Sequence, residues 1–440
     1  MVRRRAGAGR DDYPQSVGSL RPLATRLGSD LGGNYWKLWS ASAVSNLADG
    51  VFWIAFPLLA IRLTDSPVLV AGIVVVGRLP WLVFVLFAGA LADRLDRRRT
   101  MVRVALLRAV VAGGLAAGIA ANLVELPILY VAAFVLGVGE TLFDTAAQSI
   151  MPSIVDRDRL SRANGRLYAV ELMMNQFVGP PLGGFLAVVA IGLVFAGSSA
   201  AFVVGAITLA SLRGSFRPVA AARDASVLTD IREGLRYLFG HRLLRTFAIM
   251  VGVMNLASSA TFAVFVLYAV SPGPMGLNEA GFGVLMTTLA VGSLVGSVVV
   301  ERVERRLGRA RLLFVAVIMS GLTLVTPGVT ANPYVVGAAF ALSGLGVVMW
   351  NVVTVSLRQR IVPDRLLGRL NASYRLLAWG GQPVGALLGG AVGELFGLPA
   401  VFIISGLGTT LLLVAFRSVT DRAIEAAEAG SAPAPGGKPA

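Results

Sequence analysis

The segment Gly89–Arg99 (GALADRLDRRR) begins with a glycine at the end of an apolar stretch and continues into closely spaced acidic and basic residues. About 208 residues later, Glu301–Arg306 (ERVERR) repeats the charges of Asp93–Arg98 (DRLDRR) at each position. Similarity at a fixed offset indicates an internal repeat. The chain is therefore predicted to consist of two homologous halves.

Two further matches at nearly the same offset extend this repeat. Asn46–Ala48 (NLA) returns as Asn255–Ala257, and Gln176–Gly184 (QFVGPPLGG) returns as Gln382–Gly390 (QPVGALLGG). Six apolar stretches separate the members of each pair, and an even number gives both halves the same orientation across a membrane. The predicted architecture is a parallel repeat of six and six helices, with a substrate site between the halves.

Apolar stretches long enough to cross a bilayer recur along the whole chain. Hydrophobic residues make up 56% of the 440 residues, charged residues make up 14%, and the mean hydropathy is +0.75. A soluble domain carries about 25% charged residues, and a transmembrane helix needs about 20 apolar ones. We predict an all-α membrane protein whose twelve transmembrane helices lie near residues 36–62, 67–91, 101–122, 126–150, 166–190, 193–213, 246–270, 280–300, 312–331, 333–357, 369–393 and 398–417.

The predicted helices divide the chain into two halves and three polar segments. Residues 214–245 are predicted to form an amphipathic cytoplasmic linker along the membrane surface, and the Ala-, Pro- and Gly-rich end of the chain is predicted to be disordered. The predicted boundaries are 1–33 for a disordered N-terminal tail, 34–213 for the first half, 214–245 for the linker, 246–417 for the second half and 418–440 for a disordered C-terminal tail.

The net charge of +15 follows the membrane topology. Of the 39 Lys and Arg residues, all but four lie in the alternate connections that begin with the N-terminal tail; the four are Arg62, Arg78, Arg108 and Arg375. Positive residues concentrate on the cytoplasmic side of membrane proteins. Both termini are therefore expected in the cytoplasm, the protein is expected to span the cell (inner or plasma) membrane, and no nucleic-acid partner is needed to explain the charge.

No cofactor or metal is expected. The chain has no cysteine, and its one histidine, His241, cannot fill a coordination sphere alone. Neither Lys37 nor Lys438 lies in a glycine-rich phosphate loop, which argues against an ATP-driven pump. The expected partners are the lipid bilayer, a small-molecule substrate and protons, and a monomer is expected.

The segment Gly89–Arg99 resembles the signature loop of the major facilitator superfamily, with Asp96 where that family usually has glycine. The resemblance implies that Asp93 caps the N-terminus of the eleventh helix and that the arginines pair with carboxylates beneath the fourth. Together these contacts would latch a cytoplasmic gate. The gating residues implied are Gly89, Asp93, Arg94, Arg97 and Arg98.

The fifth predicted helix contains Gly179–Gly184 (GPPLGG), which resembles a motif of the family's antiporters. Its residues Gly179, Pro180, Gly183 and Gly184 are equally compatible with simple close packing and a proline kink. Nearly the whole chain resembles the branch that contains enterobactin exporters and macrolide efflux proteins. This resemblance implies a transporter rather than an enzyme.

Ionisable residues at membrane depth are costly, so each needs a partner or a function. Asp49 and Arg78 fall at similar depth in the first two helices and are expected to pair. Glu140 and Asp144 share one face of the fourth helix, and Glu171 lies in the fifth. These three acids would then share Arg108, which leaves at least one carboxylate able to carry a proton. The proton-coupling candidates are Asp144, Glu171, Glu140 and Asp49, and the charge partners are Arg78 and Arg108; a purely structural ion cluster is the alternative.

Amide, aromatic and basic side chains within the helices are candidates to line a substrate cavity, although most such residues in membrane helices only pack. The candidates are Asn46, Trp53, Asn175, Asn255, Trp350, Arg375, Trp379 and Gln382. The predicted function is export of a small amphiphile, such as a drug, siderophore or secondary metabolite, by proton antiport. A proton-coupled importer, a flippase of lipid-like molecules and a non-transporting sensor or scaffold remain alternatives.

Overall fold

The computed structural model describes residues 31–83, 96–156, 159–214, 216 and 227–429. These residues are almost entirely helical. The helices are α2 (Gly33–Ala60), α3 (Pro67–Val83), α5 (Arg97–Ala120), α6 (Leu126–Ile150), η1 (Met151–Ser153), α7 (Leu160–Leu172), η3 (Met173–Val178), α8 (Gly179–Val189), α9 (Ile191–Ala210), α10 (Val227–Gly240), α11 (Arg242–Ala269), α12 (Glu279–Leu307), α13 (Arg309–Val329), α14 (Pro333–Ile361), α15 (Asp364–Gly380), α16 (Gln382–Phe396), α17 (Leu398–Leu411), η4 (Leu412–Arg417) and α18 (Asp421–Ala429).

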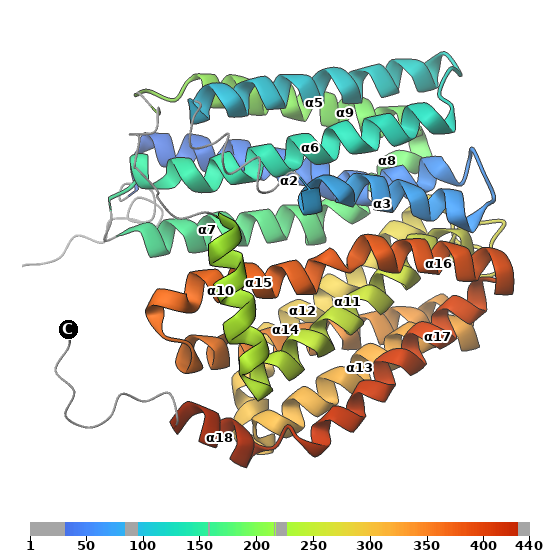
Figure 1. Cartoon of the computed structure of the whole chain (residues 1–440). Coiled ribbons are helices and arrows are strands. Elements are labelled where there is room, and N and C mark those ends of the chain that lie inside the picture. The colour runs from blue at the N-terminus through green and yellow to red at the C-terminus, as the bar shows by residue number, and fades with distance from the viewer. Residues whose placement is uncertain (1–30, 84–95, 157–158, 215, 217–226, 430–440) are drawn as a thin grey trace, which may run out of the picture.

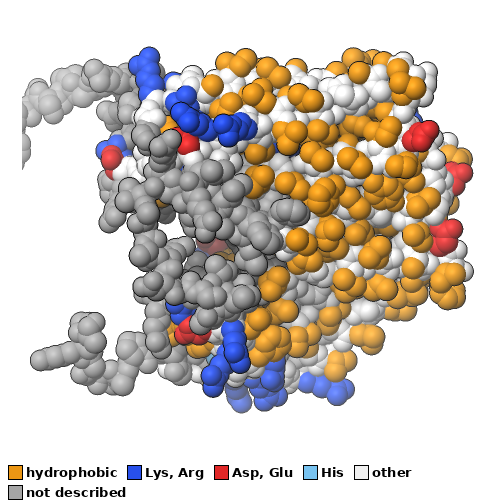
Figure 2. Space-filling view, turned by 45° about the horizontal axis from the view of Figure 1, so that its top comes forward, with side chains coloured by type: hydrophobic (Ala, Val, Ile, Leu, Met, Phe, Trp, Pro, Cys, Tyr) orange, Lys and Arg blue, Asp and Glu red, His pale blue; other side chains and the backbone are white. Residues whose placement is uncertain are grey.

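The described helices account for the twelve predicted transmembrane helices. Within the described ranges, ten helical segments are long and apolar enough to cross a membrane. The other two predicted helices correspond to α3, after which residues 84–95 are not described, and to α15 with α16, which a break at Gly381 separates. Figure 2 shows a broad band of hydrophobic side chains across the face in view, with basic side chains mainly toward one end and acidic ones at both ends. Such a band is the expected surface of a protein that lies in lipid.

The helices form two groups that lie side by side (Figure 1). α2 to α9 make the first half, and α11 to α17 make the second; α10 crosses one end of the bundle, which we call the α10 end. Direct contact between the halves runs along α3 and α16, where a Cβ at Gly390 would lie 2.9 Å from the Cβ of Ala71. It also runs along α8 and α12.

The buried residues show where the halves join. One hydrophobic core contains residues of both halves and lies toward the end opposite α10, with Phe52, Phe195, Phe265 and Phe402 among its members. Toward the α10 end each half has a core of its own, around Phe143 in the first half and Trp350 in the second. The two halves are therefore packed together at the opposite end and have separate interiors at the α10 end.

Two of the predicted polar segments contain described helices. The linker helix α10 packs on protein: Leu238 is fully buried, Tyr237 Oη donates to the Ile361 carbonyl at 3.4 Å, and Glu233 pairs with Arg369. Part of its apolar face, including Leu238, covers the second half, whereas Phe239 is 42% exposed. Within the C-terminal tail predicted to be disordered, Asp421–Ala429 forms α18.

His241 also has a more structured role than a solvated loop residue. It is the N-cap of α11, where its Nδ1 accepts the Leu244 N–H at 3.4 Å. Burial lowers the pKa of this imidazole, which keeps Nδ1 available as an acceptor at neutral pH.

Cutting the chain between about residues 218 and 228 and expressing both pieces together is expected to leave a functional complex, because each half has its own core at the α10 end. Co-purification of the two pieces and transport in vesicles would measure this. Two stably inserted pieces that do not associate would contradict it.

Candidate functional site

A buried arginine lies at the centre of the first half. Arg108 of α5 is 1% exposed, and its guanidinium donates to Asp49 and, at 2.9 Å, to Ser45 Oγ, both on α2. The guanidinium carbon lies 4.1 Å from the centre of the Phe202 ring on α9. The side chain reaches this position because Gly139 of α6 has no Cβ; one there would lie 2.7 Å from the Arg108 Cδ. One residue thus joins four helices.

The predicted pairing of Asp49 with Arg78 is wrong. Asp49 is 7% exposed and is neutralised by Arg108. The Arg78 guanidinium lies instead over the ring of Trp53, one turn further along α2, with 4.9 Å between the guanidinium carbon and the ring centre. Equal depth in the membrane was not enough to predict the pair, because the position of a side chain around the helix axis decides which partner it meets.

The other three proton-coupling candidates lie near one another. Glu140 and Asp144 of α6 and Glu171 of α7 are all half-buried. The charges of Glu140, Glu171 and Arg108 all act on Asp144. Among the described residues, no basic side chain lies within 4.0 Å of any of these carboxylates. Because Arg108 forms its ion pair with Asp49, these carboxylates have less compensation than the sequence suggested.

The fifth transmembrane helix is distorted beside this cluster. Pro180 and Pro181 supply no N–H, and the preceding turn, η3, is a π-helix in which the Gly179 N–H bonds to the Met174 carbonyl. Here α2 approaches closely, since a Cβ at Gly50 would lie 2.5 Å from the carbonyl oxygen of Asn175. Short π-helical segments often mark functional positions.

The eleventh transmembrane helix is interrupted at the corresponding position of the repeat, between Gly380 and Gln382. Side chains of α11 hold both sides of this break. Asn255 Nδ2 donates to the Ala378 carbonyl at 2.7 Å, and Ser259 Oγ donates to the Gln382 carbonyl at 2.7 Å. The Asn255 amide therefore supports the helix break.

The glycines of the antiporter-like motif make close helix contacts on two sides. Gly179 and Gly183 face α2, where a Cβ would lie 2.6 Å from Gly50 Cα and 3.0 Å from the Val51 carbonyl oxygen, respectively. Gly184 faces α12 of the other half, where a Cβ would lie 2.6 Å from the Glu279 carbonyl oxygen and 3.0 Å from Gly283 Cα. Pro180 is buried between them.

Polar contacts reinforce this junction at the end opposite α10. Arg62 pairs with Glu279 across the halves at 2.8 Å, and Ser66 Oγ donates to Glu394 at 2.7 Å. Neither contact could be predicted from the sequence, apart from the isolated position of Arg62.

Gly184→Val is expected to hold this junction open, because overpacking destabilises the closed junction by about 1–3 kcal/mol. A cost of about 1 kcal/mol is enough to raise the population of the conformer with separated halves about fivefold. A single cysteine at Leu58, which is 1% exposed in the hollow between the halves, can report opening, since the chain has no other cysteine. Labelling by an impermeant maleimide should accelerate about fivefold.

Gly197→Val is the matched control for this experiment, because nothing lies within 4 Å of a Cβ there. Equal labelling rates in the two valine variants would show that Gly184 has no role in closing the junction.

The cavity candidates fall into two groups. Asn46 and Trp350 are buried; Asn46 Nδ2 donates to the Ser42 carbonyl and Trp350 packs edge-on against Phe247, so neither faces an open surface in this conformation. Trp53 and Trp379 are about half-exposed, and Asn175 and Gln382 are half-buried beside the two helix breaks. The side chain of Arg375 lies outside the described residues.

The gating residues Gly89, Asp93 and Arg94 also lie outside the described residues. Asp96 caps α5 by accepting the Arg99 N–H at 2.9 Å. Arg98 donates to the Leu212 carbonyl at 2.8 Å, a backbone partner where the family resemblance implies a carboxylate.

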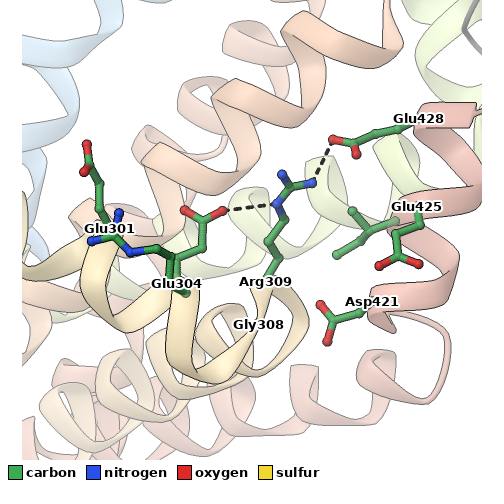
Figure 3. Close-up of a pocket in the computed structure, with 9 residues that line it drawn as sticks. Glu301, Glu304, Gly308, Arg309, Asp421, Glu425 and Glu428 are labelled. Atoms are coloured by element: carbon green, nitrogen blue, oxygen red, sulfur yellow. Dashed lines mark hydrogen bonds and ion pairs between the residues drawn. The ribbon is translucent and has the colours of Figure 1, made fainter.

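The repeat counterpart of the gating loop has a partner that sequence reasoning missed. Asp421 of α18 accepts the Ala310 N–H at 2.9 Å, and Arg309 bridges Glu304 and Glu428 at 3.1 and 2.8 Å (Figure 3). The C-terminal helix thus caps α13 and fixes the turn between α12 and α13. The sequence signal was the amphipathic pattern of Asp421–Ala429.

Comparisons with known proteins agree with this architecture. A family model described as transmembrane secretion effector matches residues 32–436. The multidrug efflux pump Tap of Mycolicibacterium fortuitum is 27% identical over 396 residues, which cover 84% of this chain and 92% of Tap. The enterobactin exporter EntS of Salmonella choleraesuis is 24% identical over 381 residues, covering 84% and 88%.

Among solved structures, a bacterial homologue of the iron transporter ferroportin in an inward-facing state matches with a TM-score of 0.67 at 17% identity, covering 88% of this chain and 98% of that one. The nucleoside transporter NupG matches with a TM-score of 0.67 at 12% identity, covering 88% and 99%. These likenesses show the fold. The match over residues 32–436 shows that the chain belongs to the transmembrane secretion effector family of major facilitator transporters.

Proposed function

We propose that the protein is a proton-driven exporter that moves a small amphiphilic molecule out of the cell as a monomer. The observation that carries the proton coupling is the group formed by Glu140, Asp144 and Glu171. Buried carboxylates close to one another and without a basic partner bind protons more readily than isolated ones. Such groups can take up a proton on one side of the membrane and release it on the other.

The distribution of charge supports an orientation with the α10 end in the cytoplasm. Basic side chains gather mainly at that end, whereas acidic ones occur at both ends (Figure 2), in agreement with the positive-inside rule. α2 begins and α18 lies at the α10 end (Figure 1), so both termini would be cytoplasmic.

The direction and the substrate class rest on the relatives. Tap is named a multidrug efflux pump and EntS an enterobactin exporter, and each matches this chain over most of its length. Half-exposed tryptophans at the boundary of the halves suit an amphiphile with an apolar ring system.

The test is a flux measurement in everted vesicles that contain the full chain. A panel of amphiphiles, including ethidium, erythromycin and 4-nitrobenzoate, is added after a preset pH gradient has formed. A substrate of a proton antiporter should discharge the gradient only in vesicles with the protein. Substrate uptake that leaves the gradient unchanged would contradict proton coupling, and proton and substrate movement in the same direction would indicate import.

A further inference from the structure

Three tryptophans and one arginine form a continuous group across the boundary of the halves, which we call the Trp–Arg stripe: Trp53 of α2, Arg78 and Trp81 of α3, and Trp379 of α15. The Arg78 guanidinium lies over Trp53, and the rings of Trp81 and Trp379 meet edge-on with 5.5 Å between their centres. Arg78 and Trp81 are three residues apart and so share a face of α3. The group therefore joins both halves.

Arg78 has no ion-pair partner among the described residues. Asp49, one turn before Trp53 on α2, is paired with Arg108. Glu140 and Asp144 lie on α6, which packs against α3 where a Cβ at Gly137 would lie 3.2 Å from Pro80 Cγ, yet neither carboxylate lies within 4.0 Å of Arg78. A guanidinium at membrane depth needs a partner, and stacking on one indole only partly supplies it.

The geometry leaves two recognition elements accessible, the edge of the Arg78 guanidinium and the tryptophan rings. A guanidinium that stacks by its face on an indole keeps the N–H groups at its edge available for an anion. Trp53 and Trp379 are 47% and 48% exposed. Trp379 is fixed between the two α11 hydrogen bonds at Ala378 and Gln382, so its ring moves with the second half while Arg78 moves with the first.

We propose that the Trp–Arg stripe binds the anionic, aromatic end of the transported molecule, an aryl carboxylate or sulfonate. Arg78 would donate two hydrogen bonds to the acid group, and the tryptophan rings would stack on the aromatic ring. This proposal rests on the proposed function, in that the ligand is the transported molecule. Aliphatic anions and aryl cations would each satisfy only one of the two recognition elements.

The test measures binding to the purified full chain in phosphatidylcholine nanodiscs without any gradient. The chain has six tryptophans, and Trp36→Phe, Trp39→Phe and Trp350→Phe leave only those of the stripe to fluoresce. 4-Nitrobenzoate, which quenches indole fluorescence, should quench saturably, whereas the matched cation 4-nitrobenzylammonium should not. Arg78→Gln should weaken 4-nitrobenzoate binding by about tenfold or more.

Arg78→Lys should retain part of the affinity for 4-nitrobenzoate, and Trp379→Leu should lose most of it. If Arg78→Gln does not fold, these two variants test the proposal in its place. Arg103→Gln removes the same charge from an exposed position at the start of α5 and should change nothing. Equal binding of the anion and the cation, or unchanged affinity in Arg78→Gln, would overturn the proposal. Displacement of the probe by phosphatidylglycerol in the nanodisc would assign Arg78 to a lipid phosphate and overturn it also.

This binding result is separable from the proposed function. A chain that binds 4-nitrobenzoate through Arg78 but does not move protons would refute proton coupling and leave the stripe intact. If the natural sequence couples transport to protons but Arg78→Gln binds 4-nitrobenzoate with unchanged affinity, the proposed function stands and the role of the Trp–Arg stripe is refuted.

Discussion

Asp144→Asn and Glu171→Gln are each expected to abolish uphill export driven by a pH gradient, while downhill exchange of substrate continues. An amide cannot carry a proton between the two sides, but the helices can still alternate around the site. Each proton that enters down the potential contributes about 2.3 kcal/mol per 100 mV, and this contribution is what the variants lose. Accumulation and exchange of one substrate in proteoliposomes would measure both effects.

Glu125→Gln provides the matched control, because Glu125 is an exposed carboxylate at the start of the same helix as Asp144 and lies outside the acid group. It should transport like the natural sequence. If Asp144→Asn, Glu171→Gln and Glu140→Gln all accumulate substrate with unchanged pH dependence, the three acids do not couple transport to protons.

Asp49→Asn is expected to destabilise the folded protein by about 3–5 kcal/mol, since it leaves the charge of Arg108 buried without its counter-ion. Replacing both residues by apolar ones, as Asp49→Leu with Arg108→Met, should cost clearly less than the single change. Unfolding in detergent by heat or denaturant, analysed as a double-mutant cycle, would give the coupling energy.

Arg62→Gln is the comparison for this cycle. It breaks an ion pair whose side chains are 45% and 23% exposed, and such pairs contribute about 0–1 kcal/mol. An Asp49→Asn variant as stable as Arg62→Gln would show that water reaches Arg108 and that the buried pair has no structural role.

The sequence predicted the fold because two of its signals are independent of lateral packing. The length of each apolar stretch is set by the bilayer, and the matches Asn46 with Asn255 and Gln176–Gly184 with Gln382–Gly390 are visible without coordinates. The structure adds that a helix distortion lies at the start of both members of the second match, as the π-helical turn up to Val178 and as the break at Gly381 just before Gln382. Proline explains why both distortions lie at these positions. The sequence does not determine whether a proline causes a π-helical turn or a break in the helix.

The candidate site was less predictable, because depth in the membrane is only one of the coordinates that a side chain needs. Arg78 and Arg108 could not be assigned to acids until the direction of each helix face was known. Gly139 was the residue that decided the pairing, since its missing side chain leaves the path for Arg108. Similarly, α18 was missed because the Pro- and Gly-rich residues after it outweigh its nine-residue amphipathic pattern.

The contact of Gly184 with Gly283 bears on leakage as well as on movement. Where two helix backbones meet without side chains between them, no polar side chain is available to bind a chain of water molecules. Water occupies protein interiors only where polar groups can bind it. The apolar core shared by both halves surrounds this contact. For the proposed proton exporter, we expect this contact to act as a dry barrier, so that a proton that reaches the acids of α6 and α7 from the α10 end does not cross the membrane until substrate moves.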